Sequence, residues 1–136
     1  MILLVFITGV VCVSCSKNTN SSPLLGTWML TSEEVIECDD SRNIYQADIP
    51  CSDSVCFRIT FVKGGEMKVD VTMEGVTNSW NETYTVDGNK ISICGPEGCM
   101  DQGTFVINNS QLILADSVAS ENGCLKKEYY KKLDGE

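Results

Sequence analysis

The chain has 136 residues, of which 43% are hydrophobic, and carries a formal net charge of −9. This length suits one domain and is too short for two. Nucleic acid is excluded as a partner, because binding it requires a positive surface that releases counterions from the phosphates. The chain contains no histidine, so the most common general base and metal ligand is missing.

The first 14 residues, MILLVFITGVVCVS, are uncharged and almost entirely apolar. This stretch is too short to span a bilayer but has the length of the apolar region of a signal peptide, which we expect at residues 1–14. The residues that follow, 15–23, are small and polar after Cys15 and are predicted to form a flexible tether. Eight cysteines in so short a chain agree with export to an oxidising compartment.

The end of this segment, Val13-Ser14-Cys15, resembles a lipobox, in which a small residue precedes a cysteine that is lipidated and becomes the new N-terminus. The resemblance implies that Cys15 carries an acyl anchor and that a lipid membrane of the bacterial cell envelope is a partner. We expect the outer membrane with the domain facing the periplasm; exposure at the cell surface is the alternative. An ordinary signal peptide cleaved near Ser14 would leave Cys15 without lipid.

From Leu24 onward, apolar and polar residues alternate with a period of two, which is typical of half-buried antiparallel strands. Gly64-Gly65 and Asp87-Gly88 supply the positive φ angles of tight hairpins. Eight strands are predicted, at residues 27–37, 55–62, 66–73, 79–86, 90–94, 99–107, 111–116 and 124–132. The predicted fold is therefore all-β: a single domain over residues 24–136, in which eight antiparallel strands in up-and-down order close into a barrel.

Gly26-Thr27-Trp28 at the start of the first strand is a GxW signature, and Lys131 and Lys132 end the last strand. Together with the eight strands and the long first connection, these residues resemble the lipocalin-like domain lipoproteins of the Gram-negative envelope, which have a calycin-type barrel. The resemblance implies that a basic side chain of the final strand packs across Trp28 at the closed end of the barrel, as a cation–π contact. We assign this role to Lys131, with Lys132 as the alternative.

Six cysteines belong to the predicted barrel, and in an up-and-down order they all fall at one end, the open mouth. Sequence alone allows 15 pairings. The predicted geometry favours Cys94–Cys99, Cys51–Cys56 and Cys38–Cys124; in a rival arrangement Cys51 or Cys56 bonds to the loop between residues 94 and 99. Four thiolates around zinc are a further alternative. We expect disulfides, no metal and no cofactor, because an oxidising compartment rarely preserves six thiols.

The chain contains no nucleophile elbow, phosphate-binding loop, zinc-protease motif or dinucleotide fingerprint, so we expect no enzyme activity. Adjacent carboxylates such as Glu33 and Glu34 point to opposite faces of a strand and cannot easily act together. An eight-stranded barrel can instead hold one small ligand or be filled by its own side chains.

We therefore predict that the barrel mouth binds a small apolar or amphipathic ligand. If Trp28 faces inward, Leu30, Ser32 and Glu34 do so as well, and the mouth loops are acidic, which favours neutral or cationic ligands. The alternative is a structural or protein-interaction module, such as an inhibitor, with a filled barrel. In both cases we expect a monomer. The candidate ligand-binding residues are Trp80, Tyr84, Phe57, Phe61 and Glu34.

Overall fold

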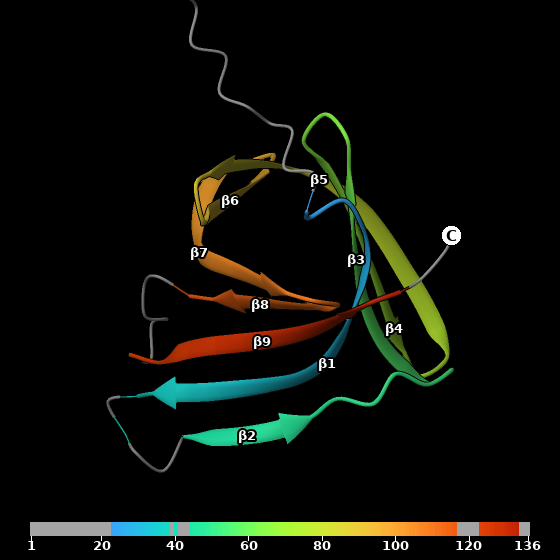
Figure 1. Ribbon diagram of the computed structural model, residues 1–136. Coiled ribbons are helices and arrows are strands. Elements are labelled where there is room, and N and C mark those ends of the chain that lie inside the picture. Colours follow the sequence, from blue (N-terminus) through green and yellow to red (C-terminus); the bar gives the residue numbers. More distant parts are fainter. Residues whose placement is uncertain (1–22, 39, 41–43, 117–122, 134–136) are drawn as a thin grey trace, which may run out of the picture.

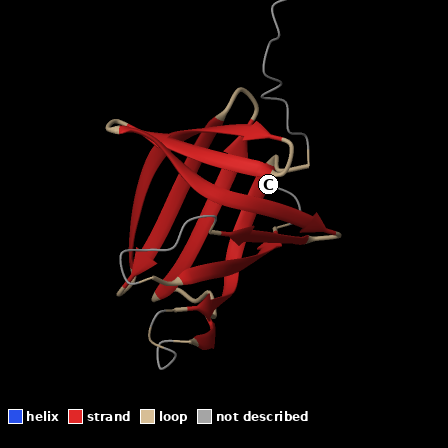
Figure 2. Cartoon of the chain, turned by 90° about the vertical axis from the view of Figure 1, so that its left-hand side faces the viewer, coloured by secondary structure: helices blue, strands red, loops and turns tan. Residues whose placement is uncertain are grey.

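The computed structural model describes residues 23–38, 40, 44–116 and 123–133. Within these residues the chain forms nine β-strands and no helix (Figure 2), and hence no helix that is long and apolar enough to cross a membrane. The strands are β1 (Gly26–Glu37), β2 (Tyr45–Asp48), β3 (Val55–Val62), β4 (Glu66–Met73), β5 (Val76–Asp87), β6 (Lys90–Gly95), β7 (Gly98–Asn108), β8 (Gln111–Ala115) and β9 (Leu125–Lys132). The expected all-β fold is confirmed.

All eight predicted strands are present, with ends that agree within one residue except at the start of β5. This strand begins at Val76 instead of residue 79, because Glu74 and Gly75 both have positive φ angles (53° and 79°) and form a tight two-residue hairpin. The ninth strand, β2, was not predicted. It lies within the long connection between β1 and β3 and is only four residues long.

The barrel closes because β1 pairs with β9, the last strand (Figure 1). On its other side β1 has two partners in succession: residues 26–29 pair with β3, and residues 32–35 pair with β2. The remaining strands follow in chain order from β3 to β9, and each is antiparallel to its neighbours. The fold is therefore a closed eight-stranded barrel to which β2 adds a short strand beside the second half of β1.

The core fills the inside of the barrel with side chains from seven of its strands and from the segment before β1. Trp28, Tyr84, Tyr130 and Phe61 are its largest members and are at most 2% exposed. The other members are Leu24, Leu30, Ile59, Met67, Val69, Ile91 and Leu112. Most of these are the apolar residues of the alternating pattern, so the period of two places them on the inner face.

Three disulfides join Cys38 to Cys124, Cys51 to Cys56 and Cys94 to Cys99, which confirms the favoured pairing and excludes both the rival and the zinc arrangement. All three lie at or beside the β1–β3, β6–β7 and β8–β9 connections. Because β1, β6 and β8 run in the same direction, these three connections lie at the same end of the barrel. The rim at this end is uneven, because β6 pairs only with residues 83–87 of β5. The β6–β7 turn therefore lies beside the middle of β5.

Candidate functional site

Trp28 is fully buried at the closed end of the barrel. Its indole Nε1 donates a hydrogen bond of 2.7 Å to the carbonyl oxygen of Leu24, and both residues are fully buried. The ammonium group of Lys132 lies 5.1 Å from the centroid of the Trp28 ring. The expected cation–π contact is confirmed, but the assignment to Lys131 is wrong. Lys132 is the residue that pairs directly with Trp28 across the strands, whereas Lys131 is one residue away and points to the other face.

Three of the predicted ligand-binding aromatic residues are part of the packed interior. Phe61 and Tyr84 are each 2% exposed, and their rings meet edge to face with centroids 4.9 Å apart. The half-buried ring of Phe57 lies 6.3 Å from that of Tyr130. Offset and edge-to-face contacts of this kind stabilise a core. The barrel interior around these rings is therefore occupied by the protein's own side chains.

Glu34 does not face the interior, so the expectation for this residue is wrong. A β-bulge between Leu30 and Ser32 shifts the register against β9 by one residue and reverses the alternation of β1 beyond it. Glu34 is paired with Lys127 on the outer face, where it accepts a hydrogen bond of 2.8 Å from the Tyr129 hydroxyl. The same bulge turns Ser32 outward.

The bulge places Glu33 on the inner face instead, directly opposite Glu128 of β9. Lys126 lies beside both carboxylates, 2.7 Å from Glu128 and 3.9 Å from Glu33. The hydroxyls of Tyr45 and Tyr130 each donate a 2.7 Å hydrogen bond, to Glu33 and Glu128 respectively. We call these five residues the inner polar cluster.

The positive charge of Lys126 and the carboxylates of the inner polar cluster stabilise one another. Burial alone would lower the pKa of Lys126, but the hydrogen bond and charge of Glu128 and the charges of Glu33 and Asp116 raise it above its ordinary value. Burial raises the pKa of Tyr130 well above that of a free tyrosine, and the neighbouring Glu128 raises it further. Lys126 therefore remains charged and Tyr130 protonated around neutral pH, and the cation separates two carboxylates that would otherwise repel.

Trp80 is the one predicted ligand-binding aromatic residue that is exposed. It pairs with Val69 on the inner face of β5, is 43% exposed and donates a 3.1 Å hydrogen bond from Nε1 to Glu82. Glu82 also lines a cavity of about 560 Å³ at the β6–β7 hairpin. We call it the hairpin cavity; its other lining residues are Ile93, Gly95, Pro96, Glu97, Gly98 and Cys99.

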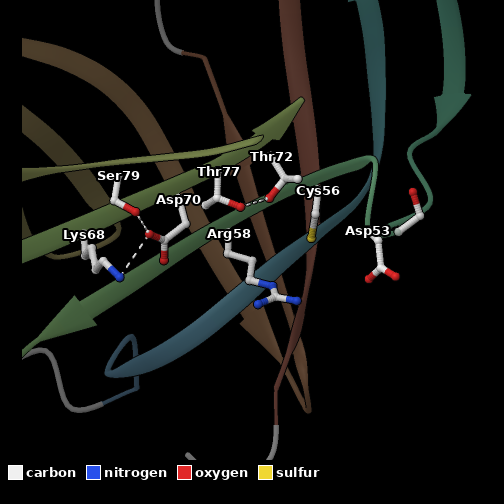
Figure 3. A pocket seen from close by; sticks show the side chains of 9 residues that line it. Asp53, Cys56, Arg58, Lys68, Asp70, Thr72, Thr77 and Ser79 are labelled. Atoms are coloured by element: carbon white, nitrogen blue, oxygen red, sulfur yellow. Dashed lines mark hydrogen bonds and ion pairs between the residues drawn. The ribbon is translucent and has the colours of Figure 1, made fainter. Parts of the chain in front are cut away.

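A second cavity of about 420 Å³ lies on the outer face of the barrel, over β3, β4 and β5 (Figure 3). We call it the outer cleft. Its floor is set by register: Arg58 of β3 lies opposite Asp70 of β4, which lies opposite Ser79 of β5. The segment before β3, which the Cys51–Cys56 disulfide ties to that strand, forms one wall. The lining residues are Ser52, Asp53, Cys56, Arg58, Lys68, Asp70, Thr72, Thr77 and Ser79.

Asp70 is the central polar group of the outer cleft. It accepts a hydrogen bond from Ser79 and forms an ion pair of 3.0 Å with Lys68. Burial opposes ionisation of Asp70, but the hydrogen bonds from Ser79 and Lys68 and the charges of Lys68 and Arg58 outweigh it. The pKa of Asp70 is therefore below its ordinary value. The Thr72 and Thr77 hydroxyls share a hydrogen bond of 2.8 Å.

The sequence interpretation did not identify the outer cleft, although its polar residues occupy the solvent-facing positions of the predicted strands. Their proximity depends on the register between strands, and no local motif encodes it. The tight turns at Gly64-Gly65 and Glu74-Gly75 were the available signal, because a short turn fixes which residues lie opposite each other.

Fold and sites together define a class: a closed, disulfide-bonded antiparallel barrel with a filled interior and with cavities at its surface. Among the described residues, no group of three or more cysteine, aspartate or glutamate side chains is arranged to hold a metal ion. Comparison of the chain with protein-family models, with curated proteins and with solved structures finds no match in any of the three.

Proposed function

We propose that the protein is a membrane-anchored, non-enzymatic binding module that holds a small amphipathic ligand, neutral or cationic, in the hairpin cavity. One observation carries this proposal: the cavity combines the apolar side chain of Ile93 with two carboxylates, Glu82 and Glu97, and contains no basic residue. A ligand with an apolar body and a cationic or hydrogen-donating group would satisfy both parts of this lining.

The cavity has the properties of a ligand site. Its volume lies within the range of about 300–1,000 Å³ that is usual for small-molecule pockets. Ile93 packs against the barrel core, and Cys94–Cys99 closes the base of the hairpin, so the cavity is formed before a ligand arrives. The exposed ring of Trp80, hydrogen-bonded to Glu82, offers apolar surface that a ligand would cover.

Anchoring at Cys15 is supported by the apolar stretch before it and by the lipobox resemblance; both fall outside the described residues. The chain enters the barrel at Leu24, which is buried against Trp28 at the closed end. A tether before Leu24 would thus leave from the end opposite the Cys38–Cys124 disulfide, so the disulfide-bearing end would face away from the membrane. The contact of Lys132 with Trp28, beside Gly26, supports the proposed kinship with lipocalin-like envelope lipoproteins.

The test is mass spectrometry of the lipoprotein purified from its native envelope, with extraction and identification of any small molecule that it carries. We expect an acyl modification on Cys15 and a co-purifying amphipathic compound that Trp80→Ala and Glu82→Gln reduce. Val106→Ala, which changes an exposed residue of β7, serves as the control and should retain the compound. An unmodified Cys15 would contradict the proposed membrane anchor. A preparation without any such compound would contradict the proposed ligand binding.

The alternative function, a structural or protein-interaction module, is favoured by one observation: the inside of the barrel is filled by Phe61, Tyr84 and their neighbours. In that case the native protein carries no small molecule. Chemical crosslinking in the envelope would then capture a specific protein neighbour, and Trp80→Ala would leave this neighbour in place.

A further inference from the structure

Arg58 lies at the centre of the outer cleft. Within the part of the chain that the structure describes, no carboxylate lies within ion-pair distance of its guanidinium, and its one hydrogen bond is a long contact of 3.9 Å to the Cys51 sulfur. Figure 3 shows the guanidinium between the Lys68–Asp70–Ser79 group on one side and Asp53 on the other. Its remaining donors are open to a ligand, and this planar fork matches a carboxylate.

The surroundings of Arg58 are rich in hydroxyl groups. Thr72, Thr77 and Ser79 project from β4 and β5, and Ser52 lies in the adjoining wall. Ionised Asp70 accepts hydrogen bonds only, and Lys68 donates them only. The cleft therefore presents donors and acceptors in close alternation, as a polyhydroxyl ligand requires.

We propose that the outer cleft binds an acidic saccharide, with the sugar carboxylate on Arg58 and the sugar hydroxyls on Asp70 and the threonine hydroxyls.

The lining favours a saccharide over a simple anion or a peptide. Asp53 and Asp70 balance Arg58 and Lys68, so the cleft has no net positive charge that would attract anions in general. A peptide needs apolar pockets for its side chains, and none of the nine lining residues is aliphatic or aromatic. A ligand that carries one carboxylate among many hydroxyls matches both the guanidinium of Arg58 and the hydroxyl-rich surroundings.

This site is independent of the hairpin cavity. Arg58, Asp70 and Ser79 are on the outer face of β3, β4 and β5, whereas Trp80 and Glu82 are on the inner face of β5. A ligand in one cavity leaves the other accessible, so either proposal can fail without the other.

The test is an NMR titration of the full-length lipoprotein in detergent micelles with three probes: D-glucuronate, D-glucose as its neutral counterpart, and acetate as its carboxylate alone. We expect saturable shifts with glucuronate and at least tenfold weaker binding of both controls, because a charge-assisted, bidentate contact contributes about tenfold or more. The Arg58→Gln variant should lose glucuronate binding to a similar degree. Lys90→Gln, which removes one positive charge outside both cavities, should bind as the parent protein does.

The outcomes separate the alternatives. Equal binding of glucuronate and acetate would show a carboxylate site without sugar recognition and overturn the proposal, as would equal binding of glucose. A tripeptide with a free C-terminus that competes at the same concentration would assign the cleft to peptides instead. The Asp70→Asn variant provides a second test in case Arg58→Gln misfolds, because it keeps the size of the side chain. We expect it to weaken glucuronate binding while leaving the amide spectrum of the barrel unchanged.

Discussion

The disulfide between Cys38 and Cys124 is expected to contribute more to stability than either of the other two, because it closes a much longer loop. The sequence separation is 86 residues, against 5 for Cys51–Cys56 and for Cys94–Cys99. The entropy that a crosslink removes from the unfolded chain increases with the logarithm of this separation. It corresponds to about 4.6 kcal/mol for the long loop and about 2.1 kcal/mol for a short one at 25 °C.

The perturbation is the double variant Cys38→Ala/Cys124→Ala, and Cys94→Ala/Cys99→Ala is its matched control. Since a domain of this size has a total stability of about 5–15 kcal/mol, loss of the long crosslink removes a large part of it. Urea denaturation followed by tryptophan fluorescence measures the free energy of unfolding of both variants and of the parent. We expect the long-loop variant to be less stable than the short-loop variant by about 2.5 kcal/mol. Equal destabilisation by the two variants would refute the entropic reasoning.

Three further predictions concern single side chains. Lys132→Met is expected to lower the free energy of unfolding by about 1 kcal/mol through loss of the contact with Trp28, whereas Lys131→Met should have almost no effect in the same urea titration. Because the folded pKa of Tyr130 is raised, its contribution to stability is complete below the unfolded value of about 10 and is lost as the pH rises further. The parent protein should therefore lose more stability between pH 9 and 11 than Tyr130→Phe; parallel losses would show that another group titrates. Lys126→Met leaves the two carboxylates of the inner polar cluster face to face, and we expect a cost of about 1 kcal/mol that shrinks when added salt screens their repulsion. A cost that is independent of salt concentration would point to lost packing instead.

The strands and their closure could be predicted because the chain repeats one physical pattern. Apolar residues at every second position define an inner face, and glycines with positive φ angles mark where strands reverse. The position of all six cysteines at one end followed from the same topology, because strand direction decides which connections meet at one end; the pairing among them was favoured but left open. These features depend on the period of the sequence, and the period is visible without a structure.

What could not be predicted depends on register and on short irregularities. The bulge after Leu30 moves one residue out of the ladder, and nothing in the sequence Thr31-Ser32 marks it. It exchanges Glu34 for Glu33 on the inner face, so a single inserted residue changed which carboxylate belongs to the inner polar cluster. The strand β2 was missed for a related reason: its four residues, YQAD, are too few for alternation to be recognised.

Because side chains fill the interior, the two proposed ligand sites lie at the surface of the barrel, and the three disulfides differ in whether they lie at the barrel closure or at one of these sites. Cys38–Cys124 lies where β1 meets β9 and so reinforces the closure of the barrel. The two short disulfides restrict the unfolded chain much less, yet each lies at a cavity: Cys56 lines the outer cleft and Cys99 lines the hairpin cavity. A six-residue ring is a poor stabiliser of a whole domain but an effective way to hold one turn in shape. We therefore infer that the two short disulfides hold the walls of the surface cavities in shape, while the long disulfide stabilises the fold.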